Sequence, residues 1–332
     1  MMRYTLYFFT VFFCSCTLSD NTMLITNSGK AQGSYYHIKY MSEMGEDFHS
    51  KIDSILLEVD SSLSIYKDYS LISALNNGRK LKTDSLFNEV FYAAEKVYIE
   101  TAGNFDCSVR PLVREWGFYK DKLDGNLKVD SIRIINLLKR VGFDKIQLLN
   151  DSLILPQGVS IDFNSLAQGF TVDLIAKYLE SKNIQDYLIE VGGELLARGL
   201  NDEGNTWRVG VDRPSEVIDF DERFQFILDL SDKALATSGN YRNFYVQDGV
   251  KYSHTINPFT GYPAKNRLLS VTVIHDNCMM ADAYATALMV MGLKKAKKFA
   301  LNKNLEIYLV YTGKDGEWKT YVSSSMKKRI VN

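Results

Sequence analysis

The sequence has few prolines and no excess of either charge. Its 39 lysine and arginine residues nearly balance 40 aspartate and glutamate residues, which gives a formal net charge of −1. Proteins that bind nucleic acids generally carry a basic excess or stripe, so we expect no nucleic-acid partner, although a local basic pocket is compatible with this balance. Only five prolines occur in 332 residues, and no tandem repeat or low-complexity tract is present. A flexible string of several domains is therefore not expected.

Cysteine is also scarce. The four cysteines are Cys14, Cys16, Cys107 and Cys278, and none forms a Cys-x-x-Cys or mixed Cys/His spacing typical of a zinc site. Zinc is therefore not expected. A disulfide between Cys107 and Cys278 is compatible with an exported protein, but the sequence does not show whether the two residues meet.

The N-terminus carries the one strongly apolar run. Residues 4–13 are mostly aromatic and aliphatic and follow Arg3, but they are too few to span a bilayer. A positive residue followed by a short apolar run is typical of a secretory signal, which is removed from the mature protein. We therefore predict a signal peptide over residues 1–16 and an exported protein.

The end of this signal resembles that of a bacterial lipoprotein. Cys16 follows the small residue Ser15 and precedes polar sequence, so it is the better candidate for lipidation than Cys14. Ordinary secretion with cleavage nearby is the alternative. We expect a lipid anchor at Cys16, a polar tether over 17–30, and a protein held at the membrane facing the periplasm, because buried acyl chains supply membrane affinity.

Residues 31–325 are expected to form one domain. Apolar residues make up 46% of the chain and charged residues 24%, which is typical of globular proteins. Apolar spacing of three to four predicts helices over 45–60, 85–101, 130–140 and 165–182, and another from Met280 that Gly292 separates from 294–302. Short apolar runs predict strands over 31–41, 145–149, 152–155, 186–191, 195–199, 206–211, 224–230, 268–275 and 305–311. Because strands and helices do not alternate regularly, we predict an α+β fold with mixed or antiparallel sheets and packed helices.

Asp282 and Thr286 form the first candidate site. They lie four residues apart in a predicted helix, so both oxygens project from one face. A carboxylate and a hydroxyl are hard oxygen ligands of the type that Mg²⁺ or Ca²⁺ prefers. Taken alone, however, such a pair is more often a surface or capping feature.

His254 is the second candidate. It ends a strand-like run over 250–253, just before a turn that contains Asn257 and Pro258. A single histidine is more often structural, but its pKa range suits a general base. The polar cluster at 237–241 is expected near the same site, with no assigned role.

Other segments have both a structural and a functional interpretation. Residues 160–170 indicate a strand entering a helix capped by Asn164 or Ser165, where free N–H groups could also bind an anion. Gly192-Gly193 indicates a turn, or a place where a ligand approaches the backbone. Residues 103–106 and 116–118 indicate a buried aromatic cluster or a wall for a flat ring.

Together and in this order, these segments resemble the FAD:protein FMN transferase family, the ApbE lipoproteins. The resemblance covers residues 23–325. Its landmarks are 33–36, 64–66, 105–106, 111–112, 116–118, 161–173, 192–193, 207–210 and the polar clusters at 237–241, 254–263 and 281–286. It implies a single ApbE-like, T-fold-related domain.

The resemblance also implies an activity. Members transfer FMN from FAD to a threonine or serine hydroxyl of an acceptor flavoprotein and release AMP, with Mg²⁺. By the same resemblance, Asp282, Thr286 and the backbone carbonyl of Ala167 hold the metal, and His254 is the base. Contacts to FAD are implied for Gln32, Tyr66, Asn104, Phe105, Asp106, Asn164, Phe170, Ile256 and Ala285. Two alternatives stay open: hydrolysis of FAD to FMN and AMP, and an exported lipoprotein that binds FAD without catalysis.

Several residues depart from the family pattern. Gln168 stands where lysine is usual, which removes a positive charge near the phosphates, and Asn257 replaces an aspartate. Gln32, Asn104 and Cys107 replace a methionine, a small residue and a proline. Because Asp282, Thr286 and His254 are present, these changes are expected to adjust binding and not to abolish the chemistry.

Overall fold

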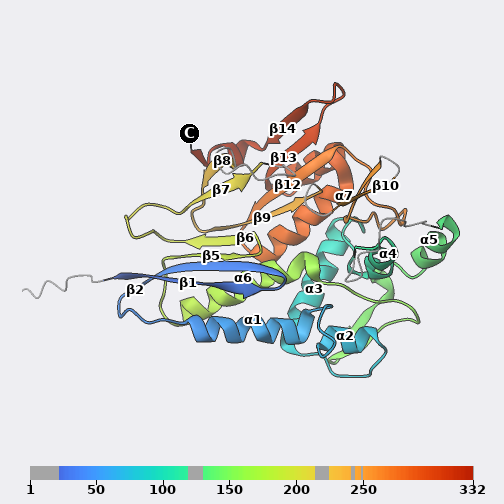
Figure 1. Cartoon of the computed structure of the whole chain (residues 1–332), viewed down its shortest axis with the longest axis horizontal. Coiled ribbons are helices and arrows are strands. Elements are labelled where there is room, and N and C mark those ends of the chain that lie inside the picture. The colour runs from blue at the N-terminus through green and yellow to red at the C-terminus, as the bar shows by residue number, and fades with distance from the viewer. Residues whose placement is uncertain (1–21, 119–129, 214–223, 241–243, 248–249, 332) are drawn as a thin grey trace, which may run out of the picture.

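The computed structural model describes residues 22–118, 130–213, 224–240, 244–247 and 250–331. Its centre is an eight-stranded antiparallel sheet in the order β1-β2-β5-β6-β9-β12-β13-β14 (Figure 1). The strands of this sheet are β1 (Met23–Ala31), β2 (Ser34–Ser42), β5 (Tyr187–Val191), β6 (Glu194–Arg198), β9 (Lys233–Gly239), β12 (Leu268–His275), β13 (Glu306–Thr312) and β14 (Trp318–Val322).

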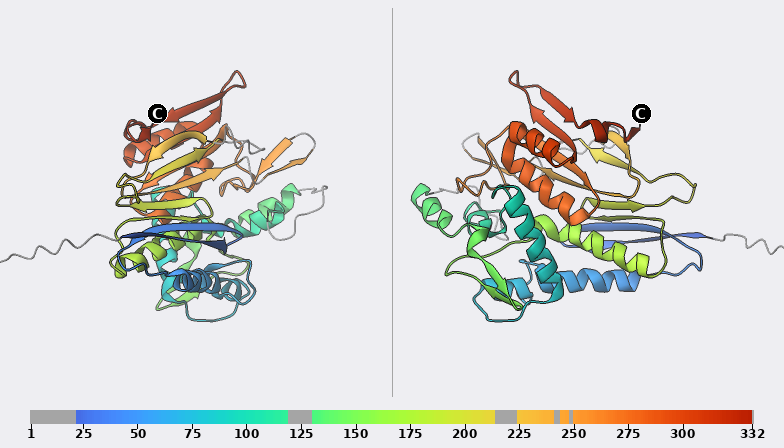
Figure 2. Two further views of the ribbon diagram at one scale, coloured as in Figure 1. Left: turned by 60° about the vertical axis from the view of Figure 1, so that its left-hand side comes forward. Right: turned by 180° about the vertical axis from the view of Figure 1, so that it is seen from behind.

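Helices cover one face of this sheet, as the view from behind shows (Figure 2). The long helices are α1 (His49–Leu63), α3 (Ser85–Glu100), α6 (Asn164–Ser181) and α7 (Cys278–Asn302). Helix α6 packs on β5 and β6, and α7 packs on β9 and β12. The shorter helices are α2 (Leu71–Asn76), α4 (Arg110–Glu115), α5 (Ser131–Leu138) and α8 (Ser324–Lys327).

A small sheet covers part of the opposite face. It has the order β15-β8-β7, with β7 (Arg208–Asp212), β8 (Phe224–Asp229) and β15 (Ile330–Val331). Its buried residues pack against residues of β6, β9, β12 and β13 in one apolar cluster. Two separate hairpins complete the described strands: β3 (Gln147–Leu149) with β4 (Ser152–Ile154), and β10 (Phe244–Gln247) with β11 (Val250–Ser253).

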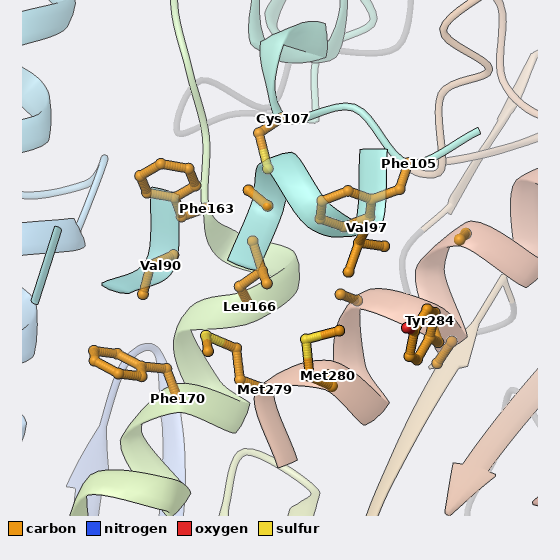
Figure 3. Packing of buried hydrophobic residues seen from close by; sticks show 14 of the residues in the cluster. Val90, Val97, Phe105, Cys107, Phe163, Leu166, Phe170, Met279, Met280 and Tyr284 are labelled. Atoms are coloured by element: carbon orange, nitrogen blue, oxygen red, sulfur yellow. The ribbon is translucent and has the colours of Figure 1, made fainter. Parts of the chain in front are cut away.

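The largest core cluster lies between α3, α6 and α7 (Figure 3). Helix α6 crosses α7 at Gly169, where an added Cβ would lie 2.5 Å from the carbonyl oxygen of Cys278. Glycine therefore permits a backbone approach that a side chain would prevent. Leu166 and Phe170 flank this contact on α6 and are fully buried, so the two helices are held together by apolar burial on both sides.

Most of the predicted elements are confirmed. The helices predicted over 45–60, 85–101, 130–140 and 165–182 are α1, α3, α5 and α6. Gly292 interrupts α7 as predicted, with φ 73° and ψ 166°. All strand pairings in the described residues are antiparallel, which agrees with the predicted α+β class.

Three predictions need correction. The polar tether over 17–30 is wrong from Met23 onward, because Met23–Ala31 forms β1, the polar edge strand paired with β2. The domain does not end at 325, since β15 pairs with β8. Neither Asn164 nor Ser165 caps α6 with its side chain: Phe163 occupies the cap position, and the Asp162 carboxylate accepts the Asn164 N–H at 2.8 Å.

The signal peptide and the disulfide are the remaining predictions, and the structure bears only on the disulfide. The predicted signal peptide and Cys16 lie outside the described residues. Cys107 and Cys278 are both buried free thiols, so they do not form the disulfide that the sequence allowed. Within the described part of the chain, no helix is long and apolar enough to cross a membrane.

The contact at Gly169 gives a direct test of the packing. Gly169→Ala should destabilise the fold by about 1–3 kcal/mol, because the added methyl group meets backbone atoms that cannot move aside without separating α6 from α7. Urea unfolding measures this change. Gly313→Ala is the matched control, since its methyl would meet only the ends of the Asp315 and Lys319 side chains. Equal unfolding midpoints for the two variants would contradict the packing account.

Candidate active site

A cavity of about 1210 Å³ opens beside the contact between α6 and α7. Its lining comes from the end of α1, the start of α6, the β5–β6 turn, the end of β9, the α4 region and the segment after β11. Residues far apart in the sequence, such as Gln32 and Val290, share its wall. Sites for drug-sized ligands usually have about 300–1,000 Å³, so this cavity has room for a dinucleotide.

The cavity collects most of the predicted site residues. Those that line it are Gln32, Tyr66, Asn104, Phe105, Asp106, Asn164, Ala167, His254, Ile256, Asp282 and Thr286. Two predicted residues do not line it. Phe170 and Ala285 are fully buried members of the core cluster, and Figure 3 shows Phe170 beside Met279.

Asp282 is the most unusual group in the lining. It is 7% exposed, and its Oδ2 atom is buried without a hydrogen-bond partner. Burial raises the pKa of Asp282 to about 7, although a hydrogen bond from the Gly169 backbone N–H opposes the rise. Leaving a buried polar atom without a partner costs about 1–3 kcal/mol. A carboxylate oxygen that faces a cavity in this state is suited to a cation.

Two further oxygens accompany Asp282. Thr286 lies one turn further along α7, as the sequence predicted, and both residues line the cavity. Ala167, in the first turn of α6, also lines it, and its carbonyl accepts the Thr171 hydroxyl at 2.7 Å. Among the described residues, no three His, Cys, Asp or Glu side chains gather into a metal site of their own. Such a donor set fits Mg²⁺, which usually takes few protein ligands and completes its shell with water and substrate phosphates.

The lining as a whole is acidic. In the described part of the chain it carries one lysine, Lys67, and one histidine, His254, against seven acidic residues: Asp60, Asp106, Asp162, Glu190, Glu194, Asp212 and Asp282. Burial raises the pKa of Asp106, and it raises that of Asp162 to about 6 while Arg110 opposes the rise. Burial therefore penalises the ionised form of these carboxylates. When they are ionised, they would repel an anionic ligand unless a cation accompanied it.

One wall of the cavity is apolar and aromatic. Phe105, Trp116, Phe118 and Ile256 contribute to it, and Trp116 is fixed by donating its indole N–H to the Gly261 carbonyl at 2.7 Å. An apolar wall of this kind suits a flat heteroaromatic ring. The sequence allowed either a plain buried cluster or such a wall. Phe105 and Trp116 are buried and also line the cavity, so both descriptions apply.

His254 lies directly after β11 and faces the Phe118 ring edge-on, with 6.4 Å between ring centroids. The next residue, Thr255, donates its hydroxyl to Asn240 Oδ1 at 3.1 Å and accepts the Ala264 N–H at 2.8 Å. Asn240 belongs to the polar cluster at 237–241, whose role the sequence left open. That cluster ends β9 at the cavity and ties the segment carrying His254 to the sheet.

Gln32 and Gln168 both line the cavity, the first from the β1–β2 turn and the second from α6. Gln32 has φ 52° and forms the β1–β2 turn with Gly33 at φ 75°, which places it at the tip of a tight hairpin. Its amide donates to the Thr171 hydroxyl at 2.6 Å. Gln168 lies against Gly192 in the β5–β6 turn, where a Cβ would lie 2.1 Å from its amide nitrogen.

Several lining residues could not have been found from the sequence. Asp60, Lys67, Glu190, Glu194 and Asp212 lie on separate elements and belong to no local motif. Alternation along β5 could have placed Glu190 opposite the buried Ile189 and Val191, but not at a cavity. Only the three-dimensional arrangement shows that acidic residues dominate the site.

Comparison with known proteins finds close relatives along nearly the whole chain. The profile of the ApbE family matches residues 32–309. An FAD:protein FMN transferase from Vibrio cholerae is 35% identical over 312 residues, which cover 90% of this chain and 91% of the relative. One from Haemophilus influenzae is 34% identical, and the match covers 92% of each chain. The solved structure of the flavin transferase ApbE from Vibrio cholerae matches with a TM-score of 0.83 at 34% identity, covering 93% of this chain and 99% of that one.

Proposed function

The chain belongs to the ApbE family of flavin transferases, and we propose that it transfers FMN from FAD to a threonine or serine hydroxyl of an acceptor protein. The hydroxyl oxygen bonds to the FMN phosphorus, the pyrophosphate P–O bond breaks, and AMP leaves. The observation that carries this proposal is the unpartnered Asp282 carboxylate oxygen in a cavity large enough for a dinucleotide.

Mg²⁺ is part of the proposal because of the charge in the cavity. When bound, Mg²⁺ would neutralise the pyrophosphate and make its phosphorus more electrophilic. The wall supplies few cationic side chains for this purpose, and Gln168 adds none. The Asp282 carboxylate, the Thr286 hydroxyl and the Ala167 carbonyl would hold the metal.

The remaining residues bind and orient the reactants. The wall of Phe105, Trp116 and Ile256 holds the flavin ring and excludes water from it. His254 accepts the proton that the acceptor hydroxyl loses as its oxygen bonds to phosphorus, and it is the one histidine in the described lining. Positioning and charge stabilisation supply most of the rate in phosphoryl transfer, so the fixed wall matters as much as the base.

Asp282→Asn should lower FMN transfer by about 100-fold or more, because it removes the charged metal ligand and several kcal/mol of transition-state stabilisation. The assay combines the protein, FAD, Mg²⁺ and an acceptor domain carrying a threonine, and reads flavin fluorescence on the acceptor after gel electrophoresis. Glu190→Gln, which removes another lining carboxylate, is the matched control and should stay active. Wild-type labelling by Asp282→Asn would contradict the metal assignment, and release of FMN and AMP without labelled acceptor would show hydrolysis instead of transfer.

His254→Asn should lower the transfer rate by about 10²–10⁴-fold, the usual contribution of a positioned general base, while leaving FAD binding nearly unchanged. Rates come from the same fluorescence assay, and FAD affinity comes from equilibrium dialysis. His37→Asn alters an exposed histidine on β2 and should behave as wild type. Unchanged transfer by His254→Asn would show that another group takes the proton.

We also propose that the protein is exported and anchored to the membrane through a lipid on Cys16. The support is the sequence itself: an apolar run over 4–13, the small residue Ser15 before the cysteine, and polar residues after it. Cys16→Ser should move the protein from the membrane fraction to the soluble fraction, as immunoblotting would show. Cys14→Ser is the matched control. Equal membrane association of Cys16→Ser and wild type would contradict the anchor.

A further inference from the structure

Asp173 connects the two helices that form the metal end of the cavity. It lies on α6, is 6% exposed, and has both carboxylate oxygens occupied. One oxygen accepts the backbone N–H of Cys278 and the other accepts that of Met279, each at 2.9 Å. These are the first two residues of α7, so a side chain of one helix caps the other.

The cap leaves the start of α7 fully satisfied by the protein. The first four N–H groups of any helix lack partners within the helix. Asp173 takes two of them, the Asn277 side chain takes that of Met280 at 2.9 Å, and the Asn277 carbonyl takes that of Ala281 at 3.1 Å. The start of α7 is therefore fixed to α6 and does not depend on water or a ligand.

Asp282 lies one turn beyond this anchored start. An α-helix rises about 1.5 Å per residue, so the four residues from Cys278 to Asp282 span about 6 Å of helix. Because the helix between them is short, a shift or tilt of α7 at Cys278 would also displace the Asp282 carboxylate. Thr286 follows on the same helix one turn later.

The other candidate ligand belongs to the helix that supplies the cap. Ala167 lies in the first turn of α6, Gly169 permits the close approach to Cys278, and Asp173 lies one turn further along. The Gly169 N–H also bonds the Asp282 carboxylate. The cap at Asp173 therefore helps to set the distance between the Ala167 carbonyl on α6 and the Asp282 carboxylate on α7.

We propose that Asp173 is a positioning residue for the metal site, which holds the start of α7 so that Asp282 and Thr286 face the Ala167 carbonyl. This inference rests on the proposed function, because it assumes that these three oxygens bind Mg²⁺. Asp173 does not line the cavity, and it acts only through the position of α7. Partners that orient metal ligands from outside typically change metal affinity by about 10- to 100-fold when they are replaced.

The test is the affinity for Mn²⁺, which prefers the same oxygen ligands as Mg²⁺ and is followed by the EPR signal of the free ion. Asp173→Asn keeps the size of the side chain, but its NH₂ group would face a backbone N–H. The Mn²⁺ dissociation constant should rise about tenfold or more, and the Mg²⁺ concentration for half-maximal transfer should rise with it. The KM for FAD at saturating Mg²⁺ should change little, because the flavin wall is untouched.

Asp84→Asn is the matched control. Asp84 is the N-cap residue of its own helix, α3, where its Oδ1 accepts the Phe87 N–H at 2.7 Å and the Ser62 hydroxyl at 2.8 Å, and α3 carries no proposed ligand. Asn caps a helix about as well as Asp, so the control should fold and keep the Mn²⁺ affinity of the wild-type protein. If Asp173→Asn does not fold, Asp173→Glu is the second variant. It keeps the charge and both carboxylate oxygens but lengthens the side chain, so it should also weaken Mn²⁺ binding.

The outcomes separate the two proposals. Wild-type Mn²⁺ affinity in folded Asp173→Asn or in Asp173→Glu, with a metal-binding wild-type protein, would overturn the role of Asp173 alone. A wild-type protein that binds no Mn²⁺ and transfers FMN without Mg²⁺ would overturn the metal assignment and this inference with it.

Discussion

The contact between α6 and α7 is the constraint on which the rest of the site depends. At Gly169 the two backbones approach too closely for any side chain, and the Asp173 carboxylate holds the first N–H groups of α7. Apolar residues on both sides bury this crossing in the largest core cluster. Because α6 brings Ala167 to the cavity and α7 brings Asp282 and Thr286, the packing that stabilises the fold also assembles the candidate metal ligands.

The cavity shows a conflict between stability and function. Asp282 keeps a buried oxygen without a partner, and acidic residues dominate the described lining. An arrangement of this kind is unfavourable in the free protein, since burial penalises each ionised carboxylate. It would become favourable if a divalent cation and a pyrophosphate entered together, as we propose, because the cation would neutralise charge on both the carboxylates and the phosphates. The charge pattern thus supports the proposed metal site on physical grounds that are independent of the family relationship.

Much of the fold followed from sequence patterns, and parts of the site did not. Helical spacing located α1, α3 and α6, and the four-residue interval placed Asp282 and Thr286 on one helix face. Strand β9 was not predicted, because its buried residues include Ala234 and Ala236, and alanine is depleted in strands. The acidic wall and the cap by Asp173 depend on contacts between distant segments, which no local pattern encodes. The family resemblance named many residues that line the cavity, although Phe170 and Ala285 lie in the core and not in the wall.

The central claim is that an acidic cavity accepts FAD only together with a divalent cation held by Asp282, Thr286 and Ala167. The most direct measurement is the affinity for FAD, followed by quenching of flavin fluorescence, in saturating Mg²⁺ and again in EDTA. Several kcal/mol of charge stabilisation would be lost without the metal, so we predict FAD binding at least about 100-fold weaker in EDTA. Equal affinities in Mg²⁺ and EDTA would contradict the account.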